Sequence, residues 1–391
     1  MKIMYKFSDL NKNFFEKKII SAHNRFIIKN YQEKELRDLF LKKNILVTGA
    51  SGSIGSEFSL SLLKFKFKKL FLLDKNENDL ALLNRRIVQE RSTKNIDFIC
   101  ADISEINLNN FLIENKINLY LNFAAIKHVR SEENLYSIKY MFSTNYESFF
   151  NINCKSKYLK KIFSISTDKA ADPSSLMGIS KLMMEHKLKK IMKNNNITVC
   201  SARFANVSFS RGSILEHALE CIKKKISFGI PSNIKRYFIT HEEAVSICYH
   251  ALLKQNNNCI VIPNKNLLGK QISIKDIINK ILKIYNYKFT YKKFSKKKYK
   301  NNKNCYIYLT GNNIVGQKMF EKFSSNYEDS FIIKSNSVLD KISLNNLEFI
   351  NLNIYNKLKS LKNIERFKYL LPTLIVGYKS KSKQLKVSQI I

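Results

Sequence analysis

The sequence has no stretch that approaches the roughly 18 to 20 uninterrupted apolar residues needed to cross a bilayer. Residues 1–7 also lack an apolar core of signal-peptide length. We therefore expect a cytoplasmic protein with no membrane span. The cysteines are odd in number and never spaced as Cys-x-x-Cys, which argues against a disulfide framework and against a zinc site. We expect no metal, and we expect reduced core residues at Cys100, Cys154, Cys200, Cys221, Cys248, Cys259 and Cys305.

Acidic residues are scarce, because 31 Asp and Glu stand against 68 Lys and Arg, for a formal net charge of +37. Such a charge is typical of proteins that bind nucleic acid or an anionic membrane surface. Lysine is abundant along the whole chain, however, together with Asn, Ile, Phe and Tyr, whereas a specific nucleic-acid footprint should be local. We therefore interpret most lysines as solvated surface and expect no nucleic-acid partner.

The 391 residues, 45% of them hydrophobic, suffice for a large core and a second lobe. From residue 44 onwards, short apolar runs alternate with longer amphipathic segments, as in buried parallel strands joined by right-handed helical crossovers. We predict an α/β fold, a doubly wound parallel Rossmann sheet with a smaller C-terminal substrate lobe. The predicted strands are 45–47, 70–73, 98–100, 119–123, 162–165 and 199–204.

Four segments follow from these patterns. We predict a helical N-terminal extension over 1–43, the Rossmann domain over 44–207, a substrate-binding lobe over 208–290 with some return to the Rossmann core, and a basic linker with a C-terminal appendage over 291–391. Within the last two segments we predict helices at 214–226, 242–253 and 274–285, an exposed loop at 291–304, and strands at 305–309, 330–333 and 349–352.

A glycine-rich turn follows the first predicted strand, where residues 48–55 read Thr-Gly-Ala-Ser-Gly-Ser-Ile-Gly. Between a strand and a helix, such glycines bring backbone N–H groups against a pyrophosphate at the helix N-terminus. Asp74 ends the second strand and suits the adenosine ribose hydroxyls, which favours NAD, while the adjacent Lys75 leaves NADP possible. Asp102 suits the adenine edge, although it could be an ordinary loop or cap residue. The predicted cofactor-binding residues are Thr48, Gly49, Gly52, Ser53, Ile54, Gly55, Asp74, Asp102, Ala124 and Lys181.

A second run of polar residues, Thr167, Asp168 and Lys169, opens from the fifth predicted strand. Ligands of open α/β sheets bind at this carboxyl edge, where a hydroxyl, an acid and an amine can divide proton transfers between them. The alternative is an ordinary surface turn. Met177 and Lys181 share one face of the next predicted helix, where short-chain dehydrogenases carry a Tyr and a Lys. Methionine cannot act as an acid or base, so Met177 taken alone is a core residue.

The stretch 166–181, Ser-Thr-Asp-Lys-Ala-Ala-Asp-Pro-Ser-Ser-Leu-Met-Gly-Ile-Ser-Lys, resembles the signature of the CapD-like polysaccharide-biosynthesis dehydratases, which are extended short-chain dehydrogenases/reductases. Within that family it is most similar to the configuration-retaining UDP-N-acetylglucosamine 4,6-dehydratases, in which Met replaces the Tyr. The resemblance covers about residues 40–290, with further matching segments at 122–130, 201–207, 211–213 and 236–240 and a weaker echo at 316–323.

The resemblance implies a catalytic NAD that takes hydride from C4 of a UDP-sugar and returns it to C6, leaving a 6-deoxy-4-keto sugar. It implies that Thr167 with Asp168 accepts the C4 hydroxyl proton, Lys169 removes the C5 proton, Asp168 protonates the departing C6 hydroxyl and Lys181 holds the ribose. The implied UDP-sugar contacts, each of which could instead be a structural charge or polar residue, are Lys127, His128, Asn206, Arg211 and Arg236.

Departures from the family pattern occur at Asp172 and Ser175, where Asn is usual, and at Ser210, which precedes Arg211 where a Gly-Ser pair is common. They bear on turn geometry and sugar specificity more than on the chemistry. Two alternatives stay open, namely an epimerase or C5-inverting dehydratase of the same fold, and a non-catalytic nucleotide- or nucleic-acid-binding protein. We also expect a homo-oligomer.

Overall fold

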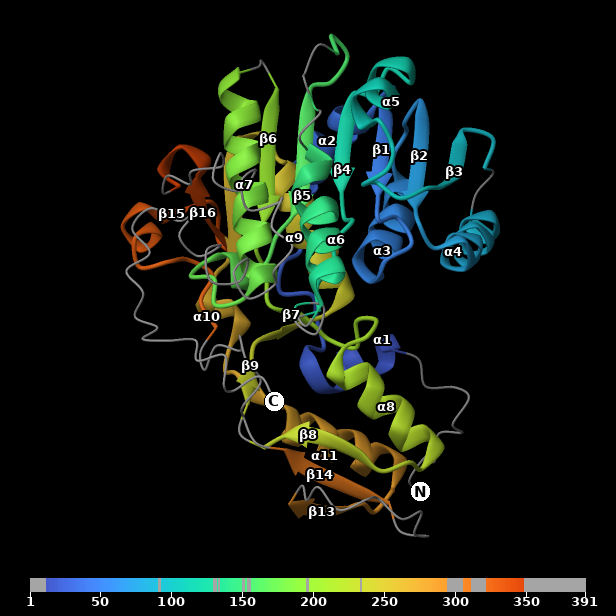
Figure 1. Ribbon diagram of the computed structural model, residues 1–391, viewed down its shortest axis with the longest axis vertical. Coiled ribbons are helices and arrows are strands. Elements are labelled where there is room, and N and C mark those ends of the chain that lie inside the picture. Colours follow the sequence, from blue (N-terminus) through green and yellow to red (C-terminus); the bar gives the residue numbers. More distant parts are fainter. Residues whose placement is uncertain are drawn as a thin grey trace.

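The computed structural model describes residues 12–90, 93–128, 132, 134–149, 152, 156–194, 197–232, 234–293, 305–310 and 321–347. A large sheet dominates these residues (Figure 1). Its strands are β1 (Asn44–Thr48), β2 (Lys69–Asp74), β3 (Ile96–Cys100), β4 (Leu119–Asn122), β5 (Lys161–Ile165), β6 (Thr198–Ala202), β11 (Cys259–Pro263), β15 (Ile333–Lys334) and β16 (Leu339–Ser343). They lie in the order β15-β16-β11-β6-β5-β4-β1-β2-β3.

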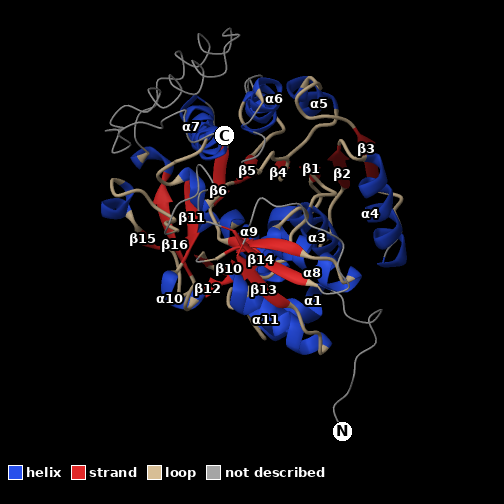
Figure 2. Ribbon diagram, turned by 60° about the horizontal axis from the view of Figure 1, so that its bottom comes forward, coloured by secondary structure: helices blue, strands red, loops and turns tan. Residues whose placement is uncertain are grey.

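Neighbouring strands from β11 across to β3 pair in parallel, whereas β16 is antiparallel to both of its neighbours. Helices cover both faces: α5, α6 and α7 lie on one side, and α3 and α9 lie on the other (Figure 2). The predicted doubly wound α/β fold is therefore confirmed. The helices here are α3 (Ser53–Ser61), α4 (Glu77–Glu90), α5 (Leu108–Glu114), α6 (Leu135–Asn145), α7 (Leu176–Asn194) and α9 (His241–Leu252), with 3-10 turns η3 (Leu62–Lys64), η5 (Glu147–Phe149), η6 (Asp168–Ala170), η7 (Lys254–Asn256) and η9 (Leu344–Asn346).

Because both faces are covered, every residue of β1 and β5 is buried, and apolar side chains form the middle of each strand. Two strands of this sheet escaped the sequence prediction: β11, within the segment assigned to the lobe, and β16, within the predicted appendage. The predicted strand at 330–333 is wrong in part, since η8 (Glu328–Phe331) occupies its start and β15 begins at Ile333. The strand predicted at 349–352 lies outside the described residues.

A smaller lobe surrounds a parallel three-stranded sheet in the order β13-β14-β8, at the bottom of Figure 1. Ser213 and Ser273 cap its two long helices through their hydroxyls, and the buried faces of those helices share a core with Ile230 and Ile307. The loop predicted at 291–304 is wrong at its start, where β13 extends to Lys293, and residues 294–304 lie outside the description. The lobe contains α8 (Ile214–Lys224), α11 (Ile274–Tyr285), β8 (Phe228–Pro231), β13 (Thr290–Lys293) and β14 (Tyr306–Thr310), and it is joined through β7 (Asn206–Val207), β9 (Lys235–Arg236), β10 (Phe238–Ile239), α10 (Lys265–Leu268) and β12 (Ile272–Ser273).

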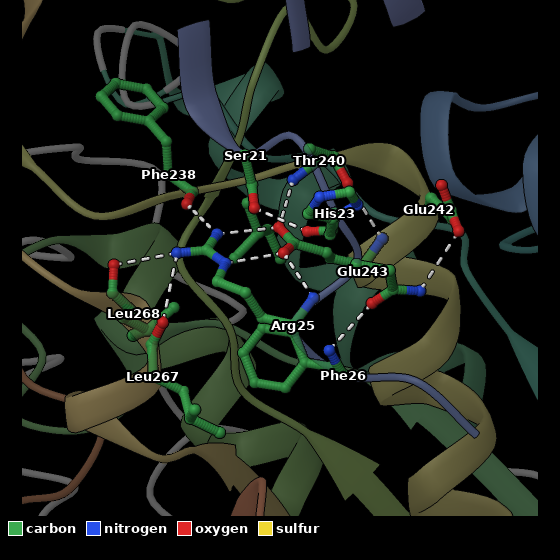
Figure 3. A network of polar contacts seen from close by, with 12 residues as sticks. Ser21, His23, Arg25, Phe26, Phe238, Thr240, Glu242, Glu243, Leu267 and Leu268 are labelled. Atoms are coloured by element: carbon green, nitrogen blue, oxygen red, sulfur yellow. Dashed lines mark hydrogen bonds and ion pairs between the residues drawn. The ribbon is translucent and has the colours of Figure 1, made fainter. Parts of the chain in front are cut away.

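The described N-terminal residues form α1 (Lys12–Phe15), the π-helical turn η2 (Glu16–Ile20) and α2 (Asn30–Phe40), and they contact both lobes. Arg25 is the anchor (Figure 3): its guanidinium donates to both carboxylate oxygens of Glu243 at 2.6 and 2.8 Å and to the backbone oxygens of Phe238 and Leu268. Glu243 also completes the N-terminal cap of α9 with Thr240. The extension is therefore bonded to β10, α9 and α10, which lie where the large sheet meets the smaller lobe.

The cysteines in the described ranges are free thiols, and Cys200, Cys221, Cys248 and Cys259 are buried as predicted. The core prediction is wrong for Cys100, which is exposed at the end of edge strand β3, and for Cys305, which is only half-buried. Cys154 lies outside the described residues. Among the described helices, none combines the length and apolarity that a bilayer crossing requires.

Candidate functional site at the carboxyl edge of the sheet

The turn between β1 and α3 accepts only glycine at its two ends. Gly49 has φ +68°, and a Cβ there would lie 2.4 Å from the backbone nitrogen of Ala124. A Cβ on Gly55 would lie 2.0 Å from the Gly49 oxygen, so the helix and the turn approach without a side chain between them. Gly52 is the N-cap of α3, whose first N–H groups have no intrahelical partners. The turn thus forms a backbone cradle for an anionic group.

Thr48 and Ala124, which lie next to the glycine turn, are both hydrogen-bonded to the Asn122 side chain. The buried Thr48 hydroxyl donates to Oδ1 of Asn122 at 2.6 Å, and the Ala124 N–H donates to the same oxygen at 3.1 Å. On the outer side, the Ser53 hydroxyl accepts from the backbone N–H of Arg211 at 2.8 Å, while the Arg211 guanidinium pairs with Asp79 of α4. The structure therefore places Arg211 at the glycine turn, and its charged group is exposed there.

Two carboxylates lie at the ends of β2 and β3. Asp74 accepts N–H groups from Ser51 and Asn76, each at 3.0 Å, which fixes its carboxylate beside the glycine turn. Asp102 accepts from Tyr140 and from both the N–H and the hydroxyl of Ser104. Burial by itself raises the pKa of Asp102, but these hydrogen bonds and nearby Lys75 outweigh it and lower the pKa below its usual value.

Thr167, Asp168 and Lys169 come together where β5 ends, as the sequence predicts for one continuous run. Thr167 caps the 3-10 turn η6, and its hydroxyl donates to Oδ1 of Asp168 at 2.7 Å. The Lys169 ammonium lies 3.1 Å from the same oxygen. Asp168 is buried, whereas the Lys169 side chain keeps 32% of its surface exposed. A hydroxyl and an amine therefore share one carboxylate oxygen.

Met177 and Lys181 lie on α7, and both are buried. The Lys181 ammonium donates to the backbone oxygen of Ile165, the last residue of β5, at 2.9 Å. Burial lowers the pKa of Lys181 to about 8, with partial compensation from Glu185. The backbone N–H of Met177 donates to Glu132, a residue that the sequence analysis did not select. Met177 offers no titratable group at the place where a dehydrogenase Tyr is expected.

Asn206 and Arg236 meet at a carboxylate that the sequence analysis also missed. Asn206 Nδ2 lies 2.5 Å from Oε1 of Glu321, and Nε of Arg236 lies 3.3 Å from the same oxygen. Glu321 falls in the weak echo at 316–323, of which residues 316–320 lie outside the description. Lys127 and His128 are exposed on the loop after β4, where the His128 ring lies against Gly212. The end of segment 122–130, from residue 129, is not described.

A buried ionic cluster supports the end of β5. The fully buried Arg203 donates to both oxygens of Glu185, at 2.8 and 2.6 Å, and to both oxygens of Glu328, at 2.7 and 2.8 Å. Glu185 also accepts from the hydroxyl of Ser166, the residue directly before Thr167, at 2.6 Å. Because Glu185 of α7, Arg203 directly after β6 and Glu328 of the C-terminal segment all contribute, the cluster links the polar run to three distant parts of the chain.

Residues 45–340 match the family described as "Polysaccharide biosynthesis protein". The chain belongs to this polysaccharide biosynthesis family. It is 30% identical over 254 residues to the capsular polysaccharide biosynthesis protein CapD of Staphylococcus aureus, covering 62% of this chain and 41% of that protein. It is 27% identical over 237 residues to a UDP-N-acetylglucosamine 4,6-dehydratase (inverting) of Campylobacter jejuni, covering 58% and 68%. The predicted family resemblance is thereby confirmed.

Solved structures share the fold of this family member. The structure of Pen from Bacillus thuringiensis has a TM-score of 0.64 at 21% identity, over 78% of this chain and 87% of that one. UDP-glucuronic acid 4-epimerase from Bacillus cereus, solved with UDP-glucuronic acid and NAD, has a TM-score of 0.58 at 19% identity, over 84% and 99%. At these identities the likeness establishes the fold alone.

Proposed function

We propose that this polysaccharide biosynthesis family member is a nucleotide-sugar 4,6-dehydratase, a lyase that converts UDP-N-acetylglucosamine to a UDP-6-deoxy-4-keto sugar with bound NAD. The observation that carries the proposal is the hydrogen-bonded group of Thr167, Asp168 and Lys169 at the carboxyl edge of the sheet. The Campylobacter relative, named as a dehydratase of this sugar nucleotide, supports the same reaction class.

The residues at the edge fit a dinucleotide. A cradle that a Cβ on Gly49 would fill lies at the N-terminus of α3, where a pyrophosphate is stabilised by backbone N–H groups. Asp74 would hold the ribose hydroxyls and repel a 2′-phosphate, which favours NAD over NADP. Lys75, the residue that leaves NADP possible, donates to the Tyr140 hydroxyl at 2.6 Å. Bound NAD would supply the acceptance of a hydride from sugar C4 and its return to C6.

The three polar side chains can divide the proton transfers. Thr167 already donates to Asp168, so a proton from the C4 hydroxyl can pass through the Thr167 hydroxyl to the Asp168 carboxylate. Once C4 is a ketone, the proton on C5 becomes acidic, and Lys169 can remove it after its ammonium has released a proton to solvent. Asp168 then gives its proton to the C6 hydroxyl, which departs as water. The protons balance, because the one taken from the C4 hydroxyl leaves with the C6 oxygen as water, and Lys169 returns a proton to C5 when C6 regains the hydride that bound NAD would supply.

The other residues predicted from the sequence would bind the cofactor and the substrate and orient them for reaction. Lys181, held against the end of β5, would contact the nicotinamide ribose. Asn206 and Arg236 provide an amide and a guanidinium for the diphosphate-linked sugar, and exposed Lys127 and His128 would add an ammonium and an imidazole from the loop after β4. Arg211 lies instead at the glycine turn, so we assign its charge to the cofactor end of the site.

Retention of configuration at C5 is the part of the proposal that Met177 supports, because a Tyr at that position would add a second acid–base group. The inverting relative and the family's UDP-glucose 4-epimerase relatives represent the competing reactions. Incubation of pure protein with UDP-N-acetylglucosamine in deuterated water, followed by NMR, distinguishes the retaining dehydratase, the inverting dehydratase and the epimerase. A 6-deoxy-4-keto product with deuterium at C5 and unchanged configuration is expected. Release of only an epimer would refute the dehydratase.

A further inference from the structure

Glu321 is the one carboxylate from the described C-terminal segment 321–347 that bonds to both Asn206 and Arg236. Its other oxygen accepts the backbone N–H of Tyr237 at 2.8 Å. Since Asn206 begins β7 and Tyr237 separates β9 from β10, a single side chain joins the segments that present the predicted sugar-nucleotide contacts. Only 6% of its surface is exposed, so its contacts are fixed within the protein.

The charges around Glu321 belong to the same site. In the described part of the chain these are Asp168 and Lys169 from η6 and Arg236 from β9. Burial first, and then repulsion from the Asp168 carboxylate, raises the pKa of Glu321 to about 7, against an opposing effect of Lys169. Glu321 therefore changes its charge near neutral pH while it touches the residues proposed to bind substrate.

We infer that Glu321 is a positioning residue, whose ionised carboxylate holds Asn206 and Arg236 in the arrangement that binds a nucleoside diphosphate-sugar. The inference rests on the proposed function for the identity of the sugar. Binding of the nucleotide part does not depend on that proposal. The ionised Glu321 carboxylate accepts hydrogen bonds from Asn206, Arg236 and the Tyr237 N–H at once. When the carboxylate is protonated, one of its oxygens becomes a hydrogen-bond donor and the attraction to Arg236 weakens. Binding should thus weaken as pH falls through the pKa of Glu321.

The test compares the wild type with Glu321→Gln, which keeps the size of the side chain and removes its charge. Asp329→Asn is the matched control, because Asp329 is an exposed carboxylate of the same segment. We expect Glu321→Gln to raise KM for UDP-N-acetylglucosamine about tenfold, with a much smaller change in kcat, and to weaken UDP binding measured by calorimetry by about the same factor. The control should match the wild type in both.

The pH dependence distinguishes positioning from a general structural role. The kcat/KM of the wild type should fall below about pH 7, and this inflection should be absent in Glu321→Gln. If that variant does not fold, Glu321→Asp serves instead, since it should retain the inflection and still raise KM. A wild type that binds UDP without turnover would end the dehydratase proposal, and the UDP arm would still decide the role of Glu321. Unchanged KM and UDP affinity in the variant, or a wild type that does not bind UDP, would overturn the inference.

Discussion

Replacing Lys169 by methionine should stop sugar turnover and leave the protein folded. Its ammonium lies 3.1 Å from Asp168, but the lysine side chain is 32% exposed. Ion pairs with a partly solvated member contribute only about 0.2–1 kcal/mol to folding, and the buried Asp168 carboxylate keeps the hydrogen bond from Thr167 when Lys169 is removed. Loss of a positioned base reduces turnover by about 10²–10⁴-fold, which corresponds to roughly 3–5 kcal/mol of transition-state stabilisation. The effect on catalysis should therefore exceed the effect on stability several-fold.

Two measurements on the same preparation check this separation. Turnover and deuterium incorporation at C5 are followed by NMR in deuterated water, and the free energy of unfolding is measured with urea. Lys34→Met, which removes an exposed lysine of α2, is the control and should behave as the wild type in both. A Lys169→Met protein that keeps more than about a tenth of wild-type turnover and C5 exchange would exclude Lys169 as the base.

Further predictions concern Gly49, Arg203 and Lys181. Gly49→Ala should abolish dinucleotide binding, measured by calorimetry, because its Cβ would lie 2.4 Å from Ala124 at a φ of +68°; wild-type affinity would contradict the cradle. Arg203→Met should lower the free energy of unfolding in urea by about 3–5 kcal/mol, since two buried carboxylates lose their cation, and adding Glu185→Gln should recover part of the loss; a change below about 1 kcal/mol would refute this. Lys181 has a folded pKa of about 8, below its usual 10.5, so the unfolded chain binds more protons between these values and stability gains from Lys181 as pH rises through that window. The stability of Lys181→Met should lack that gain, and parallel pH curves for the two proteins would show that the lysine is not desolvated.

The sequence predicted the central strands and the catalytic run because both are local. Apolar stretches between amphipathic segments identify β1, β2, β4 and β5 within a residue or two of their bounds. The glycine turn and residues 167–169 each lie within a few positions of one another and follow directly from a strand. Because β1, β4 and β5 pair in parallel, their carboxyl ends lie at the same edge of the sheet, and this follows from the strand pattern alone.

Strand β16 shows why other elements were missed. Its sequence, Leu-Asp-Lys-Ile-Ser, is half polar, and it becomes a strand by pairing antiparallel with β11 on one side and β15 on the other. Short strands of this kind are stabilised by their partner more than by their own propensity. The same holds for Cys100, which ends an apolar run but is exposed because β3 is an edge strand.

The amino-acid sequence by itself determined the family, the sheet, the backbone cradle and the order of hydroxyl, acid and amine, since each depends on neighbours in the chain. Only the tertiary structure decided which distant charges join that run. Glu321 and Glu328 lie more than a hundred positions beyond Asn206 and Arg203, to which they bond. Contacts of that separation leave no periodic pattern, because folding, and not spacing, brings the two carboxylates out of water beside their hydrogen-bond donors.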